Sequence, residues 1–271
     1  MSSLKVGVIG VGVMGEAIVN GAMNAGFLKP ADMFVYDVDR SKSMALADRH
    51  SVNSCVSMED LADKSDLVIL AVKPVVCKSV VDGIAQKLAD KALISIVAGW
   101  NSLKFSKILK KDTRLLCVMP NTPAVCGEGM SVLSANNTLL PDELQFASQL
   151  FASFGEVEII DEKYFDIVTG ISGSGPAYVF MFIEALMSAG IYNGLPARTA
   201  RKLAAQTVLG AAKALKGNDR HPAELRDAVC TPAGTTIEAV YDLERNGFSG
   251  IVMSAVDKCA KKYKQMTNDA I

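Results

Sequence analysis

The sequence predicts an α/β protein: an N-terminal Rossmann-type doubly wound sheet followed by an all-helical domain. Over the first 160 residues, short β-rich runs alternate with segments of helical length. This alternation is typical of βαβ units around a mostly parallel sheet. From about Tyr164 onward the strand-like runs stop and helical composition takes over. We therefore predict a Rossmann-type domain at 1–162 and a helical domain at 163–271.

The predicted strands are apolar along most of their length, as expected where helices cover both faces of a sheet. They are KVGVI (5–9), MFVY (33–36), DLVILAV (66–72), LISIV (93–97), RLLCVM (114–119), MSVLS (130–134) and VEII (157–160). Prolines stand near the starts of several later segments, where a helix tolerates them. These segments predict helices at 175–192, 196–216, 222–229, 235–246 and 249–266.

Composition excludes several classes of function. Lys and Arg (28) nearly balance Asp and Glu (29) and are scattered, so we expect no nucleic-acid partner. The N-terminal residues lack the pattern of a secretory signal, which favours the cytoplasm. The most apolar segment, 178–187, is too short to cross a bilayer and contains Glu184, so we expect a buried helix or a subunit contact and no membrane partner. His50 and His221 stand apart from other ligand residues, so we expect no metal.

A glycine-rich turn follows the first predicted strand and opens a helix, with Gly10, Gly12 and Gly15 in the spacing GxGxxG. The first glycine permits a tight turn, the second a close approach to pyrophosphate, and the third close packing of helix on strand. A helix N-terminus also attracts phosphate. We therefore expect a dinucleotide on these residues: Gly10, Val11, Gly12, Val13, Met14 and Gly15.

Asp37 directly follows the second predicted strand, the position at which a carboxylate accepts hydrogen bonds from the adenosine ribose. This favours the cofactor without a 2′-phosphate. Arg40 and Lys42 follow closely and would pair with a 2′-phosphate if Asp37 turned away, although both also suit an exposed first turn of helix. The sequence therefore predicts NADPH or NADH without deciding between them.

Ligands of an open α/β sheet lie beyond the carboxyl ends of its strands. Small residues and prolines at these ends suit close approach of the backbone, and Asn121 is a candidate for a hydrogen bond near the nicotinamide. Ordinary turn chemistry explains the same residues equally well. The candidate cofactor contacts are Ala71, Val72, Lys73, Pro74, Val97, Ala98, Gly99 and Asn121.

The segment TGISGSGPAYVF is a candidate location for a proton donor. Its glycines match the GxxGxG pattern of β-hydroxyacid dehydrogenases, but Val179 and Ile183 occupy the positions of the expected lysine and asparagine. The segment also lacks the GxSxG pattern of serine hydrolases. Neither alcohol oxidation nor serine hydrolysis is indicated.

The chain resembles the pyrroline-5-carboxylate reductase family over its whole length. The resemblance is carried by GVIGVGVMG, LAVKP, MPNTP, TGISGSGPAY, LAAQTVLGAAK and, most specifically, HPAELRDAVCTPAGTTIEAVYDLE. It implies NAD(P)H-dependent reduction of 1-pyrroline-5-carboxylate to L-proline, the final step of proline biosynthesis. It also implies a helical domain that intertwines with a second copy to form a homodimer, from which higher assemblies, often decamers, are built.

The resemblance further implies that the loop 230–236, CTPAGTT, binds the carboxylate of the cyclic imine through backbone N–H groups and Thr236. By itself such a loop also suits a plain turn between helices. A loop of small residues that opens a helix holds an anion well, because free N–H groups converge there and the helix dipole favours negative charge. The candidate substrate contacts are Thr231, Gly234, Thr235 and Thr236, together with Glu162, which matches a family position that reaches the substrate.

Thr236 is the candidate catalytic residue, as a hydrogen-bond donor or proton relay to the imine nitrogen. The chain departs from the family at Ala233, where a second glycine is common, at Cys230, where a small hydroxyl residue often stands, and at Met58, where relatives often carry an asparagine. The alternatives are an imine reductase of broader scope and a non-catalytic dinucleotide-sensing protein, which would need no carboxylate receptor.

Overall fold

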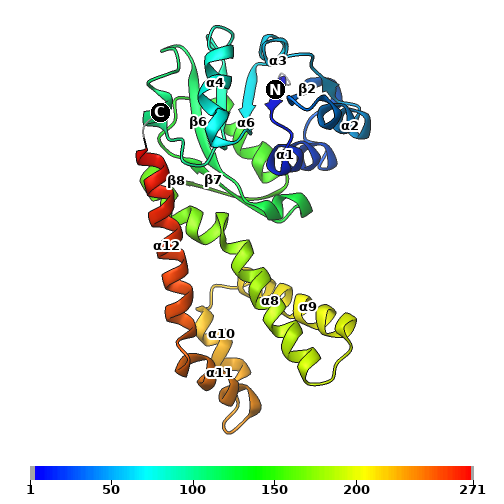
Figure 1. Ribbon diagram of the computed structural model, residues 1–271, viewed down its shortest axis with the longest axis vertical. Helices are drawn as coiled ribbons and strands as arrows, with labels where there is room; N and C mark the ends of the chain where they lie inside the picture. Colours follow the sequence, from blue (N-terminus) through cyan, green and yellow to red (C-terminus); the bar gives the residue numbers. More distant parts are fainter. Residues whose placement is uncertain (1–3, 270–271) are drawn as a thin grey trace. The chain divides into compact units, whose positions relative to one another are not determined.

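The computed structural model describes residues 4–269 (Figure 1). Its contacts divide the chain into two compact units. The first contains the residues up to Ser174 together with those from Lys258 onward, and the second is Gly175–Asp257. The predicted boundary between 162 and 163 follows a different criterion, the change from strands to helices, and the last strand ends at Ile160.

The first unit is built on one eight-stranded sheet with the order β3-β2-β1-β4-β5-β6-β7-β8. The first six positions form the strand order 3-2-1-4-5-6 that is typical of dinucleotide-binding folds. All neighbouring strands are parallel except β6 and β7. The strands are β1 Val6–Ile9, β2 Met33–Tyr36, β3 Asn53–Ser54, β4 Leu67–Leu70, β5 Ala92–Ser95, β6 Arg114–Met119, β7 Gly129–Ser134 and β8 Gly155–Ile160. The predicted fold class is confirmed.

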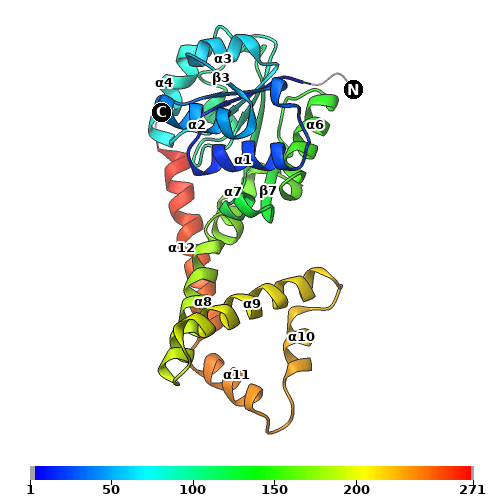
Figure 2. The same ribbon diagram turned by 90° about the vertical axis from the view of Figure 1, so that its right-hand side faces the viewer.

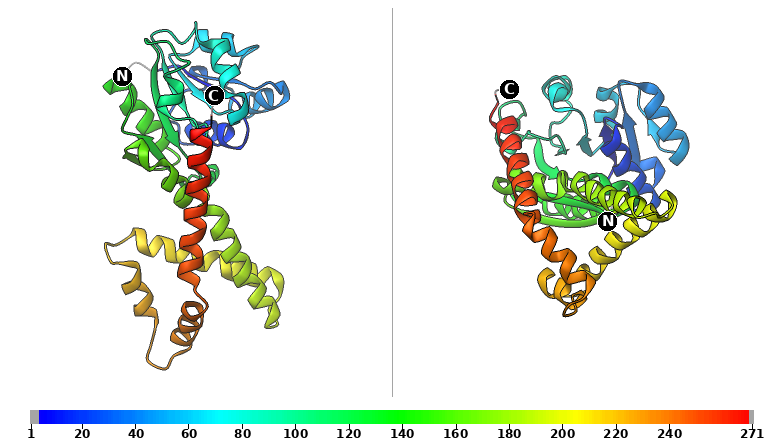
Figure 3. Two further views of the ribbon diagram at one scale, coloured as in Figure 1. Left: turned by 60° about the vertical axis from the view of Figure 1, so that its left-hand side comes forward. Right: turned by 60° about the horizontal axis from the view of Figure 1, so that its bottom comes forward.

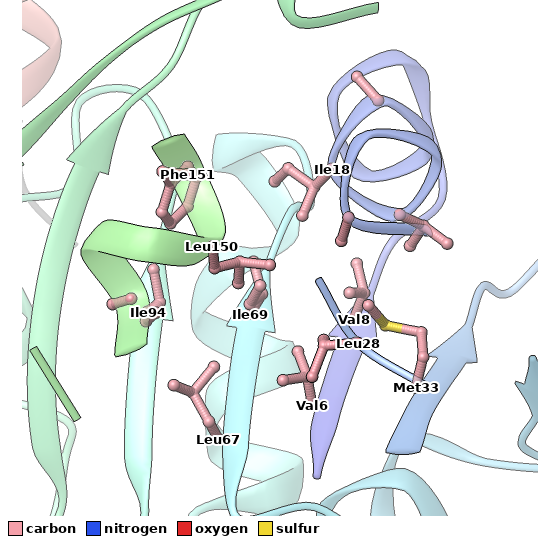
Figure 4. Close-up of a cluster of buried hydrophobic side chains, with 14 of the residues drawn as sticks. Val6, Val8, Ile18, Leu28, Met33, Leu67, Ile69, Ile94, Leu150 and Phe151 are labelled. Atoms are coloured by element: carbon pink, nitrogen blue, oxygen red, sulfur yellow. The ribbon is translucent and has the colours of Figure 1, made fainter. Parts of the chain in front are cut away.

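Helices cover both faces of the sheet and close two hydrophobic clusters. In one, Ile18 of α1 and Leu150 and Phe151 of α6 pack on side chains of β1, β4 and β5 (Figure 4). The helical elements of this unit are α1 Val13–Asn24, η1 Pro30–Asp32, α2 Arg40–His50, α3 Met58–Lys64, α4 Pro74–Ile84, α5 Ser102–Phe105, η2 Thr122–Cys126, α6 Pro141–Ala152, η3 Glu162–Tyr164, α7 Phe165–Val168 and the π-helical turn η4 Thr169–Gly173.

The second unit consists of helices with little core of their own. Its elements are α8 Gly175–Tyr192, α9 Ala197–Lys216, α10 Pro222–Val229, α11 Thr235–Arg245 and the first half of α12 Phe248–Asn268. α8 packs against α9 (Figure 2). Large apolar side chains of α8 and α12 lie in solvent; Phe180 and Ile251 are each 66% exposed. The buried hydrophobic residues among the described part of this unit are Ala200 and Ala204.

The end of α12 belongs to the first unit. Ala260 and Tyr263 are buried there, and Tyr263 joins the hydrophobic cluster of β6 and α4. Lys104 donates a hydrogen bond from Nζ to the carbonyl of Met266 at 2.8 Å. The last predicted helix therefore reaches back to the domain that begins the chain.

The helical run Glu162–Tyr192 has the length and mean hydropathy (1.3) of a membrane-spanning helix, and none of its most apolar window is buried. It is longer than the apolar segment 178–187 singled out in the sequence. Length and composition are its only membrane-like features, and an apolar helix face also suits a subunit contact.

Candidate active site

The glycine-rich turn between β1 and α1 contains two glycines in close contact with backbone atoms and one in an open position. Gly10 adopts a positive φ of 95°, and a Cβ there would lie 2.6 Å from the carbonyl oxygen of Ala71. A Cβ on Gly15 would lie 1.9 Å from the carbonyl oxygen of Gly10. A Cβ on Gly12 would meet nothing within 4 Å. Gly10 and Gly15 thus permit close packing, whereas Gly12 leaves the approach to the helix open.

The N-terminus of α1 is available to an anion. Gly12 is its N-cap, and no side chain among the described residues caps the helix there. By contrast, Asp39, Ser57 and Asn101 cap α2, α3 and α5 with their own oxygen atoms. The open helix end, with exposed Gly12 and Val13, suits a pyrophosphate group.

Asp37 lies directly after β2, and each of its two carboxylate oxygens accepts a hydrogen bond from a backbone amide. Its Oδ2 accepts a hydrogen bond from the amide of Val11 at 2.8 Å, and its Oδ1 accepts one from the amide of Asp39 at 2.9 Å. The carboxylate is therefore joined to the glycine-rich turn. Arg40 and Lys42 are exposed in the first turn of α2, and Lys42 lies 3.9 Å from Asp39.

The predicted contacts at the later strand ends lie in different surroundings. Ala71 packs under Gly10, and Lys73 is the exposed N-cap of α4, ahead of Pro74. Val97 is buried, Val72 and Ala98 are half-buried. Gly99 is enclosed, since a Cβ there would lie 3.1 Å from Cβ of Met266 in α12. Their roles as cofactor contacts stay predictions.

Asn121 follows β6 and is 9% exposed. Its Oδ1 accepts a hydrogen bond from the amide of Met130 at 2.8 Å, and its Nδ2 donates one to the carbonyl of Ser172 at 3.0 Å. The side chain thus links the end of β6 to the π-helical turn of the TGISGSG segment. Its contact with a nicotinamide stays a prediction.

The loop between α10 and α11 is a tight turn followed at once by a helix (Figures 2 and 3). The amide of Gly234 donates to the carbonyl of Thr231 at 3.0 Å, and Ala233 has a φ of 55°. Proline at the second position and a positive φ at the third are the pattern of a type II turn. Because glycine adopts positive φ without strain, the departure at Ala233 stands at the position where glycine fits best.

Gly234 is restricted by its own loop. A Cβ there would lie 2.2 Å from Oγ1 of Thr231, so any side chain displaces that hydroxyl or the backbone. Gly234 is also the N-cap of α11, and no side chain among the described residues caps this helix. Thr236 is half-buried in the first turn, whereas Thr231 and Thr235 are exposed. The loop therefore offers an open helix N-terminus surrounded by hydroxyl groups.

Glu162 lies in the first unit and is joined to α5. Its carboxylate accepts hydrogen bonds from the amide of Ser102 at 3.0 and 3.2 Å and from the Ser102 hydroxyl at 2.5 Å. It lines a pocket of about 470 Å³ together with Asn136 and Tyr263. Burial raises the pKa of Tyr263 to about 12, so that phenol stays protonated at neutral pH. The reach of Glu162 to a substrate stays a prediction.

Several features of the site carry no local signal in the sequence. The hydrogen bond from Val11 to Asp37 joins residues 26 positions apart, and the pairing of Ser102 with Glu162 joins residues 60 positions apart.

His221 caps α10, since its Nδ1 accepts a hydrogen bond from the amide of Ala223 at 3.2 Å. Among residues 4–269, no group of three or more His, Cys, Asp and Glu side chains is arranged to hold a metal ion.

Comparison with known proteins gives two family matches. Residues 162–266 match the family described as pyrroline-5-carboxylate reductase dimerisation, and residues 5–99 match the family described as NADP oxidoreductase coenzyme F420-dependent. Proteins named pyrroline-5-carboxylate reductase are similar over nearly the full length. The one from Escherichia coli (strain K12) is 39% identical over 97% of this chain and 98% of its own, and the one from Glycine max is 38% identical over 98% and 97%.

Solved structures give the same result. A pyrroline carboxylate reductase from Plasmodium falciparum, with NADP bound, is similar with a TM-score of 0.91 and 35% identity, covering 99% of this chain and 100% of that one. A pyrroline-5-carboxylate reductase from Coxiella burnetii has a TM-score of 0.92 and 30% identity with the same coverage. The resemblance found in the sequence is confirmed.

Proposed function

The chain belongs to the pyrroline-5-carboxylate reductase family, and we propose that it reduces 1-pyrroline-5-carboxylate to L-proline, the final step of proline biosynthesis. When bound, NADH or NADPH supplies the hydride, which is delivered to the imine carbon. A protonated imine is a strong hydride acceptor, so the chain has to align two reactants and stabilise charge.

The observation that carries this proposal is the open N-terminus of α11 directly after the turn at Thr231–Gly234. The substrate's ring bears a carboxylate, and an uncapped helix end binds such an anion through its first amides and its dipole. We assign the amides of Thr235 and Thr236 and the hydroxyls of Thr231, Thr235 and Thr236 to the carboxylate. Gly234 supports the site because it leaves Thr231 in place.

The hydroxyl of Thr236 is assigned a second task at the ring nitrogen. If the imine enters neutral, this hydroxyl donates a hydrogen bond or relays a proton to it, directly or through water. Thr236 is half-buried in the first turn of α11, which limits how far its side chain moves. Glu162 is assigned to the substrate through its family position, and its bonds to Ser102 orient its carboxylate.

The cofactor is assigned to the first unit. The open N-terminus of α1 binds the pyrophosphate, and Asp37 faces the adenosine ribose. Residues at the ends of β4, β5 and β6 face the dinucleotide in this proposal, as the strand order requires.

The helical unit is assigned to a homodimer. Many of its large apolar side chains are exposed in the single chain, and extended apolar surfaces of that kind mark interaction sites. Assembly beyond the dimer, up to a decamer, belongs to the same proposal, as do a cytoplasmic location and the absence of nucleic-acid or membrane partners. Measuring the mass of the purified protein in solution tests the assembly.

The direct test follows nicotinamide absorbance when the protein is mixed with 1-pyrroline-5-carboxylate and either NADH or NADPH, with L-proline identified by chromatography. The matched substrate is 1-pyrroline, which lacks the carboxylate. A site built for a polar group rejects an analogue that lacks it, so we expect kcat/KM to fall at least about a hundredfold for 1-pyrroline. Equal rates on both imines would instead indicate a reductase of broader scope, and dinucleotide binding without turnover would indicate a sensor.

A further inference from the structure

The carboxylate of Asp37 is fixed between two backbone amides at the site assigned to the adenosine ribose. Oδ2 accepts a hydrogen bond from Val11 at 2.8 Å, and Oδ1 accepts one from Asp39 at 2.9 Å. Each carboxylate oxygen has a further lone pair. The group therefore keeps the capacity to accept hydrogen bonds from a ribose 2′-hydroxyl while it stays bound to the backbone.

Turning this side chain away is unfavourable. Val11 is 3% exposed, so its amide would lose its partner in a place that water scarcely reaches. A buried N–H without a partner is costly, whereas a surface side chain changes rotamer freely. Binding of a 2′-phosphate beside Arg40 and Lys42 requires Asp37 to move, and the bond to Val11 opposes that movement.

The nearby cations do not compensate. Arg40 and Lys42 are exposed, so solvent and salt screen their attraction for a phosphate. Lys42 lies 3.9 Å from the Asp39 carboxylate, which already offsets part of its charge. A half-buried Asp37 carboxylate beside the ribose is screened less and repels a 2′-phosphate.

We infer that this reductase prefers NADH to NADPH and that Asp37, fixed by the amides of Val11 and Asp39, determines the preference. The inference rests on the proposed function, because it concerns the same cofactor site. It names the residue that selects between the two cofactors.

The test is calorimetric binding of NAD⁺ and NADP⁺ to the full-length protein, without imine substrate. The 2′-phosphate of NADP⁺ and the carboxylate of Asp37 carry like charges, which lowers the affinity when they are brought together. We therefore expect NAD⁺ to bind about tenfold or more tightly than NADP⁺. In Asp37→Ser, the repulsion is removed, so the ratio moves toward NADP⁺ by about tenfold.

Asp48→Ser is the matched control. It removes the same charge from an exposed position later in α2 and leaves the pairing of Lys42 with Asp39 in place. Its NAD⁺ to NADP⁺ ratio should stay within about twofold of that of the unaltered protein. Wild-type protein that binds NADP⁺ as tightly as NAD⁺ overturns the inference even if Asp37→Ser does not fold. Equal shifts in the two variants overturn it as well, since bulk charge would then explain the preference.

Dinucleotide binding and turnover together distinguish a wrong cofactor preference from a wrong function. Tight NADP⁺ binding with turnover leaves the reductase in place and removes only the role of Asp37. Absence of binding of either dinucleotide removes the cofactor site and the inference together.

Discussion

The two units of this chain differ in how they bury their apolar side chains. The first closes two clusters on either side of its sheet, with residues such as Ile69 and Phe105 fully buried. The second leaves Phe180, Met181 and Ile251 more than 60% exposed. Burial of apolar surface is the main favourable contribution to folding. The first unit is therefore stabilised within one chain, whereas the second depends on a partner.

The largest effect should come from a charge on the exposed face of α8. Phe180→Asp replaces an apolar side chain with one that is costly to bury without a partner charge. We expect the assembly to dissociate to single chains and turnover to be lost. Light scattering after size-exclusion chromatography gives the mass, and the imine assay gives turnover.

Val56→Asp is the control for that experiment. Val56 is 68% exposed in the first unit, nearly the same as Phe180, but belongs to a unit with its own core. Its mass and turnover should stay unchanged. An intact assembly in Phe180→Asp would contradict the distinction between the two units.

The second effect concerns the loop of the helical unit. In Gly234→Ala the new Cβ would lie 2.2 Å from Oγ1 of Thr231, so the carboxylate site must rearrange. Displacement of about 1 Å costs about a hundredfold in rate, and we expect that loss in kcat/KM. NADH affinity should not change.

The matched substitution is Gly217→Ala, where the new Cβ meets its nearest atom at an ordinary 3.4 Å. It should retain turnover. A full rate in Gly234→Ala, or an equal loss in both variants, would show that the loop is not the substrate site.

The third effect concerns the internal stability of the first unit. Arg114 donates two hydrogen bonds to Glu143, at 2.7 and 2.8 Å, and the amide of Leu140 donates a third at 2.9 Å. Burial alone would raise the pKa of Glu143, but these donors outweigh it, and the pKa lies below its ordinary value of 4.5. The stabilisation is therefore present above pH 4.5 and is lost as the pH falls through the lowered pKa.

In Glu143→Gln the free energy of unfolding should fall by about 1–3 kcal/mol at neutral pH. The difference from the unaltered protein should shrink below pH 4.5 and should not depend on protein concentration. Urea unfolding at several pH values measures it, with the exposed Glu128→Gln as control. A difference that persists in acid would contradict this explanation.

The smallest effect is expected at Ala233. A non-glycine residue at positive φ is strained by about 1 kcal/mol, and glycine relieves this strain but adds flexibility to the unfolded chain. Ala233→Gly should therefore change the free energy of unfolding by less than about 1 kcal/mol, toward greater stability, with turnover retained. Thermal unfolding checks this, and a clear loss of stability would show that the turn is not strained.

The fold could be predicted wherever the pattern is local. Apolar runs bounded by turns identified the strands to within two residues at most ends, and α8 and α10 begin and end where the sequence predicts. The strand β3 was missed because it consists of two residues, Asn53 and Ser54, without apolar character. The return of the end of α12 to the first unit was missed because helical periodicity says nothing of where a helix packs.

The candidate site could also be predicted only where its signal is local in the sequence. Glycine spacing and the loop of small residues identify two open helix ends, at Gly12 and Gly234, because a missing side chain is visible in the sequence. Hydrogen bonds between residues far apart in the sequence are not visible in this way. The amide of Val11 on Asp37 and the pairing of Ser102 with Glu162 depend on the folded backbone.

The most direct test of the account is a crystal structure of the protein with L-proline and NAD⁺. We expect the carboxylate of proline within hydrogen-bond distance of the amides of Thr235 and Thr236, with its ring against the nicotinamide. Proline bound away from residues 230–236, with the N-terminus of α11 in contact with solvent only, would contradict the central claim that this loop is the substrate receptor.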